Sequence, residues 1–287
     1  MKQLKKYLPY ILISSIFLVG ITTAFLLYTH KDKYIMKVVF LDVGQGDSIY
    51  IEAPNGKQVL IDGGPDAKLL SSLAKVMPFA DRSIDMVIAT HPDADHIGGL
   101  PILLDNYKVT SILENGATST SAVYASLEDK ISKDKVNKII ARRGMHIILD
   151  DKKNIYLDIL FPNRDISNME SNDGSIVSKL VYGNDSFMFT GDASLYTENL
   201  IEWNESDSTL HSEVLKLAHH GARTSSSSLW LEKVNPSIAI ISAGKNNKYG
   251  HPHQETLDRL SSLHIPYLST IDIGNIMFRS DGVKLSY

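Results

Sequence analysis

From residue 36 onward, short apolar runs alternate with polar turns, and this pattern predicts a mixed α/β domain. Runs bounded by glycine, proline and acidic residues indicate strands, whereas apolar residues spaced three and four apart indicate helices. The first half begins with predicted strands at Met36–Val43, Asp47–Ala53 and Gln58–Asp62. A predicted helix at Asp66–Met77 and a strand at Ile84–Thr90 follow. A β meander therefore leads into strand–helix alternation.

The second half repeats this order of elements. A hairpin with strands at Ile176–Gly183 and Ser186–Thr190 is followed by a helix near Ala193–Trp203, and then by alternating strands and helices. Two such halves can press their mixed sheets together and leave their helices outside. The predicted fold is therefore α/β, a four-layer αββα sandwich, and no internal boundary divides residues 36–287.

An uncharged apolar stretch, Leu8–Tyr28, precedes this domain. A helix of that length can cross a bilayer core of about 30 Å. Lysines among the first six residues favour an N-terminus on the cytoplasmic side. The stretch is longer than the apolar part of a signal peptide and lacks a small-residue cleavage site, so an uncleaved anchor is favoured over a cleaved signal. We predict a single-pass membrane anchor and linker at residues 1–35 and an extracytoplasmic domain at 36–287.

The net charge and the cysteine content limit how the chain could bind nucleic acid and which ligands and nucleophiles it can offer. The formal net charge is −4, so a nucleic acid would have to meet a local basic patch rather than a positive field over the whole surface. The chain contains no cysteine, which excludes disulfides, thiolate metal ligands and a cysteine nucleophile.

The strongest chemical signal is the stretch Thr90–Gly99, which follows a predicted buried strand. It places His91, Asp93, Asp95 and His96 within six positions. Neutral imidazole and carboxylate are common ligands of zinc, manganese and iron, and a tight loop lets several of them face one centre. Asp95 could instead cap a following helix, but capping does not require two histidines interleaved with two aspartates. The pattern predicts a metal site.

Three further polar clusters follow predicted strands and can converge with the first. Asp192 follows an apolar strand, His219 and His220 follow another, and His251 lies in a later loop. Together they add a carboxylate able to bridge two metal ions and at least one further imidazole, which is what a dinuclear site needs.

In this order, the motifs at His91–His96, Thr190–Asp192 and His219–Gly221 resemble those of the metallo-β-lactamase superfamily. Four shorter segments resemble the hydrolase domain of the ComEC family of competence DNA-uptake proteins. They are residues 41–48, 61–64, 171–175 and 249–252. The resemblance covers about residues 36–287. It implies the metallo-β-lactamase fold, two divalent metal ions (zinc or manganese), and hydrolysis, above all of a phosphoester.

The resemblance also implies which residues bind the metals. It assigns two metal sites that share Asp192, with the other ligands Asp95, His96 and His219 in one and His91 and Asp93 in the other. The superfamily usually has histidine at the position of Asp93 and a third histidine before Asp192. In that region this chain offers Asn172, Asp173 and Ser175. Asp47 and Asp62 are expected to support turns or ligands rather than to bind metal.

A mechanism follows from two cations that share a water. The resulting hydroxide would attack phosphorus, Asp93 or Asp95 would orient it, and His220 or His251 would stabilise or protonate the leaving group. The leading hypothesis is an extracytoplasmic phosphodiesterase or nuclease acting on DNA, such as single-stranded DNA, or on another phosphoester. A phosphocholine- or teichoic-acid-type esterase or a lactonase is the second hypothesis. A membrane-tethered binding protein with a degenerate metal site is the alternative of another class.

Overall fold

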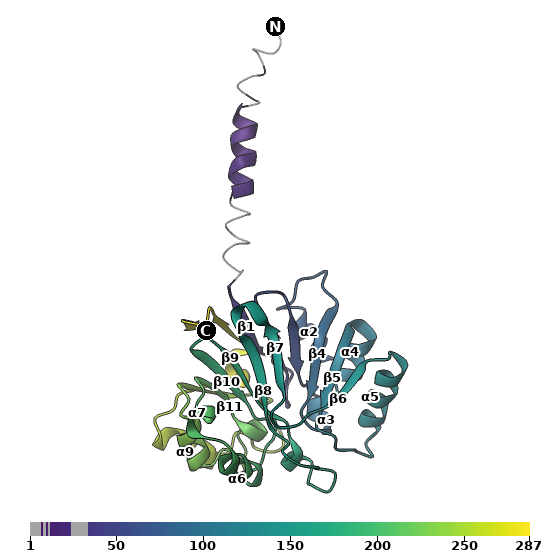
Figure 1. The fold of residues 1–287 in the computed structure, drawn as a ribbon, viewed down its shortest axis with the longest axis vertical. Coiled ribbons are helices and arrows are strands. Elements are labelled where there is room, and N and C mark those ends of the chain that lie inside the picture. Colours follow the sequence, from purple (N-terminus) through teal and green to yellow (C-terminus); the bar gives the residue numbers. More distant parts are fainter. Residues whose placement is uncertain (1–6, 8–9, 11, 24–33) are drawn as a thin grey trace. The chain divides into compact units, whose positions relative to one another are not determined.

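The structure is a computed structural model that describes residues 7, 10, 12–23 and 34–287. The chain divides into two compact units, residues 1–35 and residues 36–287. Residues 12–23 of the first unit are helical (Figure 1). Among the described residues, no helix has the length and apolar character needed to span a membrane. Part of the predicted span Leu8–Tyr28 lies outside the described residues, so the membrane anchor stays a prediction.

The strands of residues 36–287 form two mixed sheets (Figure 1). The first sheet has eight strands in the order β15 (Leu285–Ser286), β14 (Ile276–Ser280), β1 (Met36–Phe40), β2 (Ile49–Glu52), β3 (Gln58–Ile61), β4 (Ser83–Ala89), β5 (Lys108–Glu114) and β6 (Asn137–Ile140). Pairing is antiparallel from β15 to β3 and parallel from β3 to β6. The last two strands of the chain thus return to the sheet of the first half.

The second sheet repeats the same arrangement. Its seven strands lie in the order β13 (Tyr267–Ser269), β12 (Ile238–Ile241), β11 (Val214–Lys216), β10 (Asp185–Phe189), β9 (Val177–Tyr182), β8 (Ile155–Phe161) and β7 (His146–Asp150). Pairing is antiparallel from β7 to β10 and parallel from β10 to β13. The predicted repeat, strands first and then strand–helix alternation, is confirmed.

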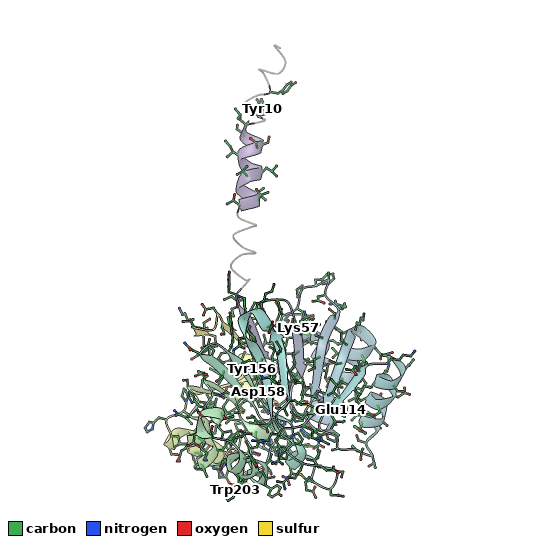
Figure 2. The ribbon with its side chains drawn as sticks, in the orientation of Figure 1. Tyr10, Lys57, Glu114, Tyr156, Asp158 and Trp203 are labelled. Atoms are coloured by element: carbon green, nitrogen blue, oxygen red, sulfur yellow. The ribbon has the colours of Figure 1, made fainter. Side chains whose placement is uncertain are left out.

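Helices cover the outer face of each sheet. Beside the first sheet lie α2 (Lys68–Leu73), α3 (Ala94–Ile97), α4 (Leu100–Asn106) and α5 (Ala122–Lys133). The second half contributes α6 (Leu195–Asn204), α7 (Asp207–Leu210), α8 (Ser228–Val234), α9 (Gln254–Ser262) and α10 (Thr270–Ile273). The two tryptophans differ: Trp230 of α8 is 1% exposed and packs in the outer core, whereas Trp203 of α6 is 90% exposed on the surface (Figure 2). The four-layer αββα fold is thereby confirmed.

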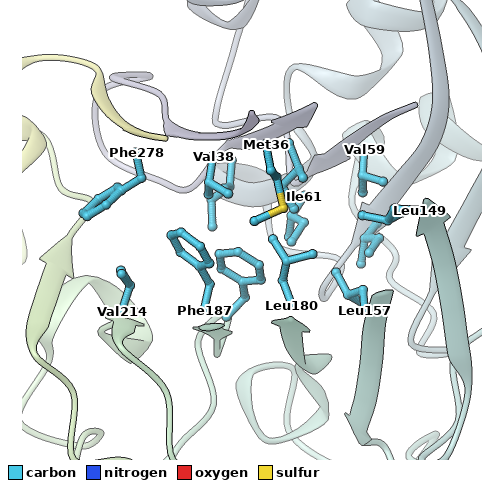
Figure 3. Packing of buried hydrophobic residues seen from close by; sticks show 14 of the residues in the cluster. Met36, Val38, Val59, Ile61, Leu149, Leu157, Leu180, Phe187, Val214 and Phe278 are labelled. Atoms are coloured by element: carbon cyan, nitrogen blue, oxygen red, sulfur yellow. The ribbon is translucent and has the colours of Figure 1, made fainter. Parts of the chain in front are cut away.

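The central core lies between the two sheets (Figure 3). Successive side chains of a strand point to opposite faces, so Met36, Val38 and Phe40 enter this core while Val39 enters the core beneath the helices. Phe40 meets Phe278 edge to face, with ring centroids 5.9 Å apart, an arrangement that aromatic pairs favour. Because these side chains are buried between the sheets, the packing of the two sheets determines which strand ends lie at the same edge of the molecule.

The segment after β4 differs from the predicted one. Asp95 was considered as a possible cap of one following helix, but two short helices form, and Asp93 occupies the position before α3 without a side-chain capping bond. The backbone is pressed against the loop after β3, because a Cβ added at Gly98 would lie 2.1 Å from the carbonyl oxygen of Pro65. Asp95 lies within the first turn of α3, and its carboxylate faces His220.

Candidate metal centre

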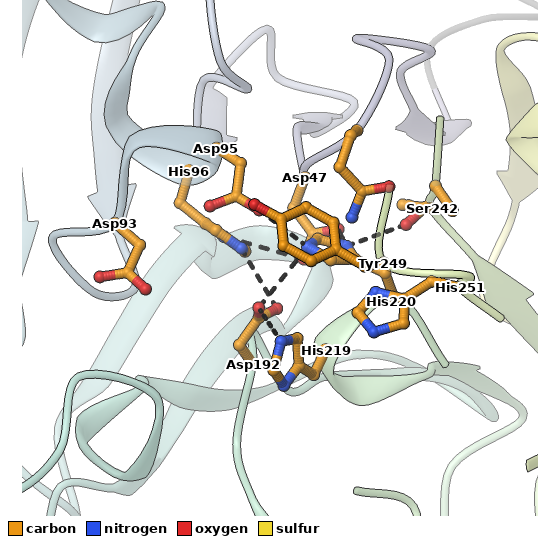
Figure 4. A network of polar contacts seen from close by, with 12 residues as sticks. Asp47, Asp93, Asp95, His96, Asp192, His219, His220, Ser242, Tyr249 and His251 are labelled. Atoms are coloured by element: carbon orange, nitrogen blue, oxygen red, sulfur yellow. Dashed lines mark hydrogen bonds and ion pairs between the residues drawn. The ribbon is translucent and has the colours of Figure 1, made fainter. Parts of the chain in front are cut away.

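The site forms where loops from both sheets meet at one edge of the sandwich (Figure 4). His96 follows β4, Asp192 follows β10, His220 follows β11, and Asp47 lies between β1 and β2. These four side chains are buried, and each offers one ligand atom within 4.8 Å of the others. The strand-end positions inferred from the apolar pattern therefore do converge, although they come from both sheets.

Asp192 lies between two imidazoles. Its Oδ1 is 3.2 Å from His96 Nε2, and its Oδ2 is 3.5 Å from His220 Nε2. Asp95 completes the group, with its Oδ2 at 3.3 Å from His220 Nε2. We call Asp95, His96, Asp192 and His220 the Asp192 half of the site.

Both imidazoles of the Asp192 half are oriented from behind. His96 Nδ1 lies 2.7 Å from Asp62 Oδ2, and Asp62 also accepts bonds from the backbone N–H and the hydroxyl of Thr90. His220 Nδ1 donates to the carbonyl of Ser242 at 2.9 Å and lies 3.2 Å from Asp47 Oδ1. With Nδ1 engaged in this way, each Nε2 faces Asp192, as in metal sites where a carboxylate or carbonyl fixes the ligand tautomer. Asp62 thus has the supporting place expected for it.

Lys216 is a buried residue that sequence reasoning missed. Its ammonium contacts the Asp47 carboxylate and donates to the carbonyl of Gly191 at 3.1 Å. It lies 3.9 Å from Asp192 Oδ1. The sequence carried a signal, because Lys216 is the single charged residue within the apolar run from Val214 to Ala218, and buried charges are normally paired.

The His91 half of the site, made of His91 and Asp93, is more open. His91 is buried, with its Nδ1 near the hydroxyls of Thr90 (3.1 Å) and Ser175 (3.3 Å). Its Nε2 lies 3.7 Å from Asp93 Oδ2, and the Asp93 side chain is 44% exposed. Ser171 donates to Asp93 Oδ1 at 2.6 Å. Serine and asparagine side chains thus occupy the region where the superfamily usually has its third histidine.

Adjacent histidines take different places. Both have a left-handed backbone, with φ of 51° at His219 and 56° at His220, and their rings are inclined by 76°. His220 enters the buried cluster, whereas the His219 side chain is 27% exposed, with its Nε2 3.7 Å from Asp192 Oδ2. His251 lies beyond them, with its ring centroid 5.2 Å from that of His219. The sequence resemblance assigned His219 to the metal, whereas the structure places His220 in the buried cluster, because the turn sets the direction of each side chain.

The charged groups of the Asp192 half stabilise one another in their ionised forms. Burial alone would lower the pKa of His220, but Asp192 and Asp47 outweigh burial and raise it to about 9. The pKa of His96 is likewise raised, because Asp192 and Asp62 outweigh its burial. Burial would raise the pKa of Asp95, but His220 and His96 hold it well below its usual range. Without a metal, the protonated imidazoles of His96 and His220 therefore balance the charge of these carboxylates. A metal cation could take the place of the imidazole protons.

Two other imidazoles behave in the opposite way. Burial, together with the neighbouring His96, lowers the pKa of His91 to about 4. Burial and the neighbouring His220 and His219 lower the pKa of His251 to about 4. Both rings are neutral at pH 7, so His91 is ready to bind a metal without losing a proton.

The donor set fits divalent metal ions. His91 Nε2 is buried without a hydrogen-bond partner, and His96 Nε2 and Asp192 Oδ1 make no well-formed hydrogen bond although they lie 3.2 Å apart. Such orphaned atoms are rare in folded proteins, and coordination to a metal would satisfy all three. The buried cluster is therefore consistent with metal binding.

A cavity of about 130 Å³ opens onto the cluster; we call it the small cavity. It is lined by Gln45, Asp93, Asp95, Asp192, His219, His220, Tyr249 and His251. Six of the eight residues singled out from the sequence thus share one cavity, while His91 and His96 lie buried close by, with ring centroids 4.1 Å apart. A small substrate group could reach the carboxylates and imidazoles from this side.

An αββα sandwich with a buried aspartate–histidine cluster at the sheet edge defines a class of metal-dependent hydrolases. This chain belongs to the metallo-beta-lactamase superfamily, whose family model matches residues 41–245. It is 32% identical over 265 residues to ComE operon protein 3 of Bacillus subtilis, covering 85% of this chain and 33% of that protein. It is 29% identical over 245 residues to Recombination protein 2 of Haemophilus influenzae, covering 82% and 28%. The chain spans about a third of the length of these relatives.

Solved structures agree on the fold. The metallo-beta-lactamase fold protein YhfI from Bacillus subtilis matches with a TM-score of 0.57 at 13% identity, over 85% of this chain and 100% of that one. Igni18, a metallo hydrolase from Ignicoccus hospitalis, matches with a TM-score of 0.53 at 16% identity, over 85% and 98%. At these identities the likeness is one of fold.

Proposed function

We propose that this chain is a metal-dependent phosphodiesterase, a nuclease that hydrolyses DNA or a related phosphoester outside the cytoplasm. The carrying observation is the buried Asp192 carboxylate, which lies between His96 and His220 and borders a cavity with two further carboxylates. The relatives of this chain include Recombination protein 2 and Competence protein ComA, whose names support a nucleic-acid substrate. The apolar stretch Leu8–Tyr28 supports a membrane anchor with the catalytic unit on the outer side.

In this proposal the site holds two divalent ions, zinc or manganese. The Asp192 half would hold one, and His91 and Asp93 would hold the other, with Asp192 between them. Bound ions would supply Lewis acidity, which lowers the pKa of water and neutralises phosphate oxygens.

The chain's own residues position the reaction. Asp93 and Asp95, which line the small cavity, would orient the attacking water by accepting its hydrogen bonds. His220 is in contact with Asp47, Asp95 and Asp192, so in this proposal it would bind the ion of the Asp192 half rather than act on the leaving group. His251 borders the same cavity with a pKa lowered to about 4 by burial and its histidine neighbours, so it would steady the leaving oxygen as a neutral hydrogen-bond donor.

The test begins with the full chain stripped by a chelator and reloaded with zinc or manganese. Substrates would be single-stranded DNA, RNA, bis(p-nitrophenyl) phosphate, a phosphocholine ester and a lactone. We expect metal-restored hydrolysis of the phosphodiesters. Asp192→Asn, which keeps the shape of the side chain, should lower kcat/KM about 1,000-fold, since it removes about 4 kcal/mol of charge stabilisation. Cleavage of only the choline ester or the lactone, or an undiminished Asp192→Asn enzyme, would contradict the proposal.

A further inference from the structure

A second hollow adjoins the small cavity and takes no part in the proposed positioning of water and leaving group. This large cavity has a volume of about 590 Å³ and shares Gln45, Asp95 and Tyr249 with the small cavity. Cavities of roughly 300–1,000 Å³ take small organic groups. A substrate held at the small cavity would therefore extend directly into the large one.

The walls of the large cavity combine apolar, acidic and cationic groups, with Asp66 and Asp95 as the carboxylates. Val43, Pro65 and Ala94 give it an apolar surface, and Lys68 and Lys248 add positive charge. Lys68 is already paired with Asp42 at 2.6 Å. Lys248 lies with its Nζ 5.0 Å from the ring centroid of Tyr249. The Lys248 ammonium thus lies over the ring of Tyr249, so a ligand that stacks on this face has to displace it.

Contacts with His251 and Asn247 hold the Tyr249 side chain and its loop in place. Its ring stacks on that of His251, with centroids 5.6 Å apart and planes inclined by only 21° (Figure 4). His251 is 8% exposed, whereas Tyr249 is 51% exposed. Asn247 fixes the loop through side-chain bonds with the backbone of Tyr249 and His251. Half of a large aromatic side chain therefore stays open to solvent on a supported loop.

We propose that the large cavity is a nucleotide subsite of the proposed phosphodiesterase: one base of a single-stranded nucleic acid stacks on Tyr249, and the adjoining phosphate meets Lys248. The inference rests on the proposed function, since the neighbouring phosphate would be the one cleaved. Bases stack on exposed aromatic rings in single-strand-binding proteins, and each such contact contributes about 1–3 kcal/mol. A base within a duplex is not available for this contact, so the subsite selects single strands.

The test measures binding and hydrolysis separately. The full chain, held in chelator so that nothing is cleaved, is titrated into fluorescein-labelled oligothymidylate and read by fluorescence anisotropy. Tyr249→Ala should raise Kd about tenfold, because losing about 1.4 kcal/mol of stacking is a tenfold change. Tyr249→Phe should stay within about twofold of the wild type, because it keeps the ring. With metal restored, Tyr249→Ala should raise KM for the oligonucleotide more than KM for bis(p-nitrophenyl) phosphate, which has no base.

Two matched controls sharpen the test. Lys248→Ala should weaken binding more than Lys245→Ala, which makes the same charge change in the same loop at a residue outside the described lining of the large cavity. An oligonucleotide with a single abasic position, used with unmodified protein, should lose affinity only when that position reaches the cavity. This comparison needs no variant and holds even if Tyr249→Ala folds poorly.

The possible failures can be told apart. Equal weakening by Tyr249→Phe and Tyr249→Ala, or equal affinity for duplex and single strand, would overturn the subsite. Competition by phosphocholine without measurable binding of the oligonucleotide would overturn it in favour of a quaternary-ammonium headgroup, another ligand of aromatic rings. If the metal-loaded wild type cleaves no phosphodiester at all, the proposed function fails, whatever the binding experiment gives.

Discussion

The two halves of the site use the same residue types in contrasting surroundings. In the Asp192 half, His96 and His220 are fully buried and their Nδ1 atoms are held by Asp62 and by the carbonyl of Ser242. In the His91 half, His91 is steadied only by hydroxyl groups, and Asp93 is 44% exposed. Imidazole and carboxylate alone do not define a metal site, because the groups that hydrogen-bond to these ligands decide how firmly their orientation is held.

The two halves of the site also differ in how their charges are balanced. Lys216 and two protonated imidazoles balance the buried carboxylates of the Asp192 half, so this half is compact and neutralised before any metal arrives. The His91 half holds a neutral imidazole and a carboxylate open to the small cavity. We therefore expect the first half to bind its ion tightly, in exchange for protons, and the second to exchange its ion readily.

Among substitutions that leave the ligands themselves intact, the largest expected effect on metal affinity comes from removing support behind a ligand. Asp62→Asn keeps the shape but loses the charge that aligns His96, and such changes typically weaken metal affinity 10- to 100-fold. Ser171→Ala, which removes the single hydroxyl on Asp93, should weaken it by less than about threefold. Competition with a chromophoric chelator measures both, with circular dichroism as the check on folding. Equal losses in the two variants would remove the contrast between the halves.

Sequence reasoning captured what depends on local pattern. The strands predicted at Gln58–Asp62 and Ser186–Thr190 differ by no more than one residue at each end from the observed Gln58–Ile61 and Asp185–Phe189, because apolar runs between turns are local signals. It missed the short strands β6 and β13, whose partly exposed sequences, Asn137–Ile140 and Tyr267–Ser269, carry little apolar pattern. Their pairing comes from neighbouring strands and not from their own residues.

For the site, the motifs predicted which loops meet and the supporting position of Asp62, but not the other groups that lie behind the ligands. Lys216 and Asp47 are 169 residues apart in sequence and touch only because both sheets close on one edge. The choice between His219 and His220 is likewise set by two consecutive left-handed residues, which nothing in a His-His-Gly sequence discloses. Partners of this kind require the packed fold.

The second prediction uses pH to separate the halves. Asp192 and Asp47 outweigh burial and raise the pKa of His220 to about 9, so below that pH a metal must displace its proton. Affinity at the Asp192 half should therefore rise roughly tenfold per pH unit for each proton released, from about pH 6 to about pH 9. His91, whose pKa burial and His96 lower to about 4, should give no such slope. Metal titrations at several pH values, with proton release measured calorimetrically, would test this.

The metal-free protein gives an independent readout of the same charges. Because the folded-state pKa of His220 exceeds the usual value of about 6.5, its stabilising contribution is complete below that pH and is lost as pH rises through about 9. Thermal unfolding in chelator should therefore show a falling Tm between about pH 6.5 and about pH 9, and added metal should flatten the decline. Identical pH slopes for two bound ions, with a constant Tm in chelator, would contradict the assignment of charge to the Asp192 half.

The smallest expected effect concerns which ion the His91 half prefers. Asp93 stands where the superfamily usually has histidine, so this half offers one imidazole and otherwise oxygen. Imidazole suits zinc, whereas carboxylate and water suit manganese. We expect manganese to support activity at least as well as zinc, and one ion to be lost on purification. Asp93→His should raise zinc affinity at this half by about three- to tenfold and reduce manganese activation, because one carboxylate becomes an imidazole. Metal content measured beside the activity of stripped and reloaded enzyme tests this, and tight zinc occupancy of both halves without manganese activation would refute it.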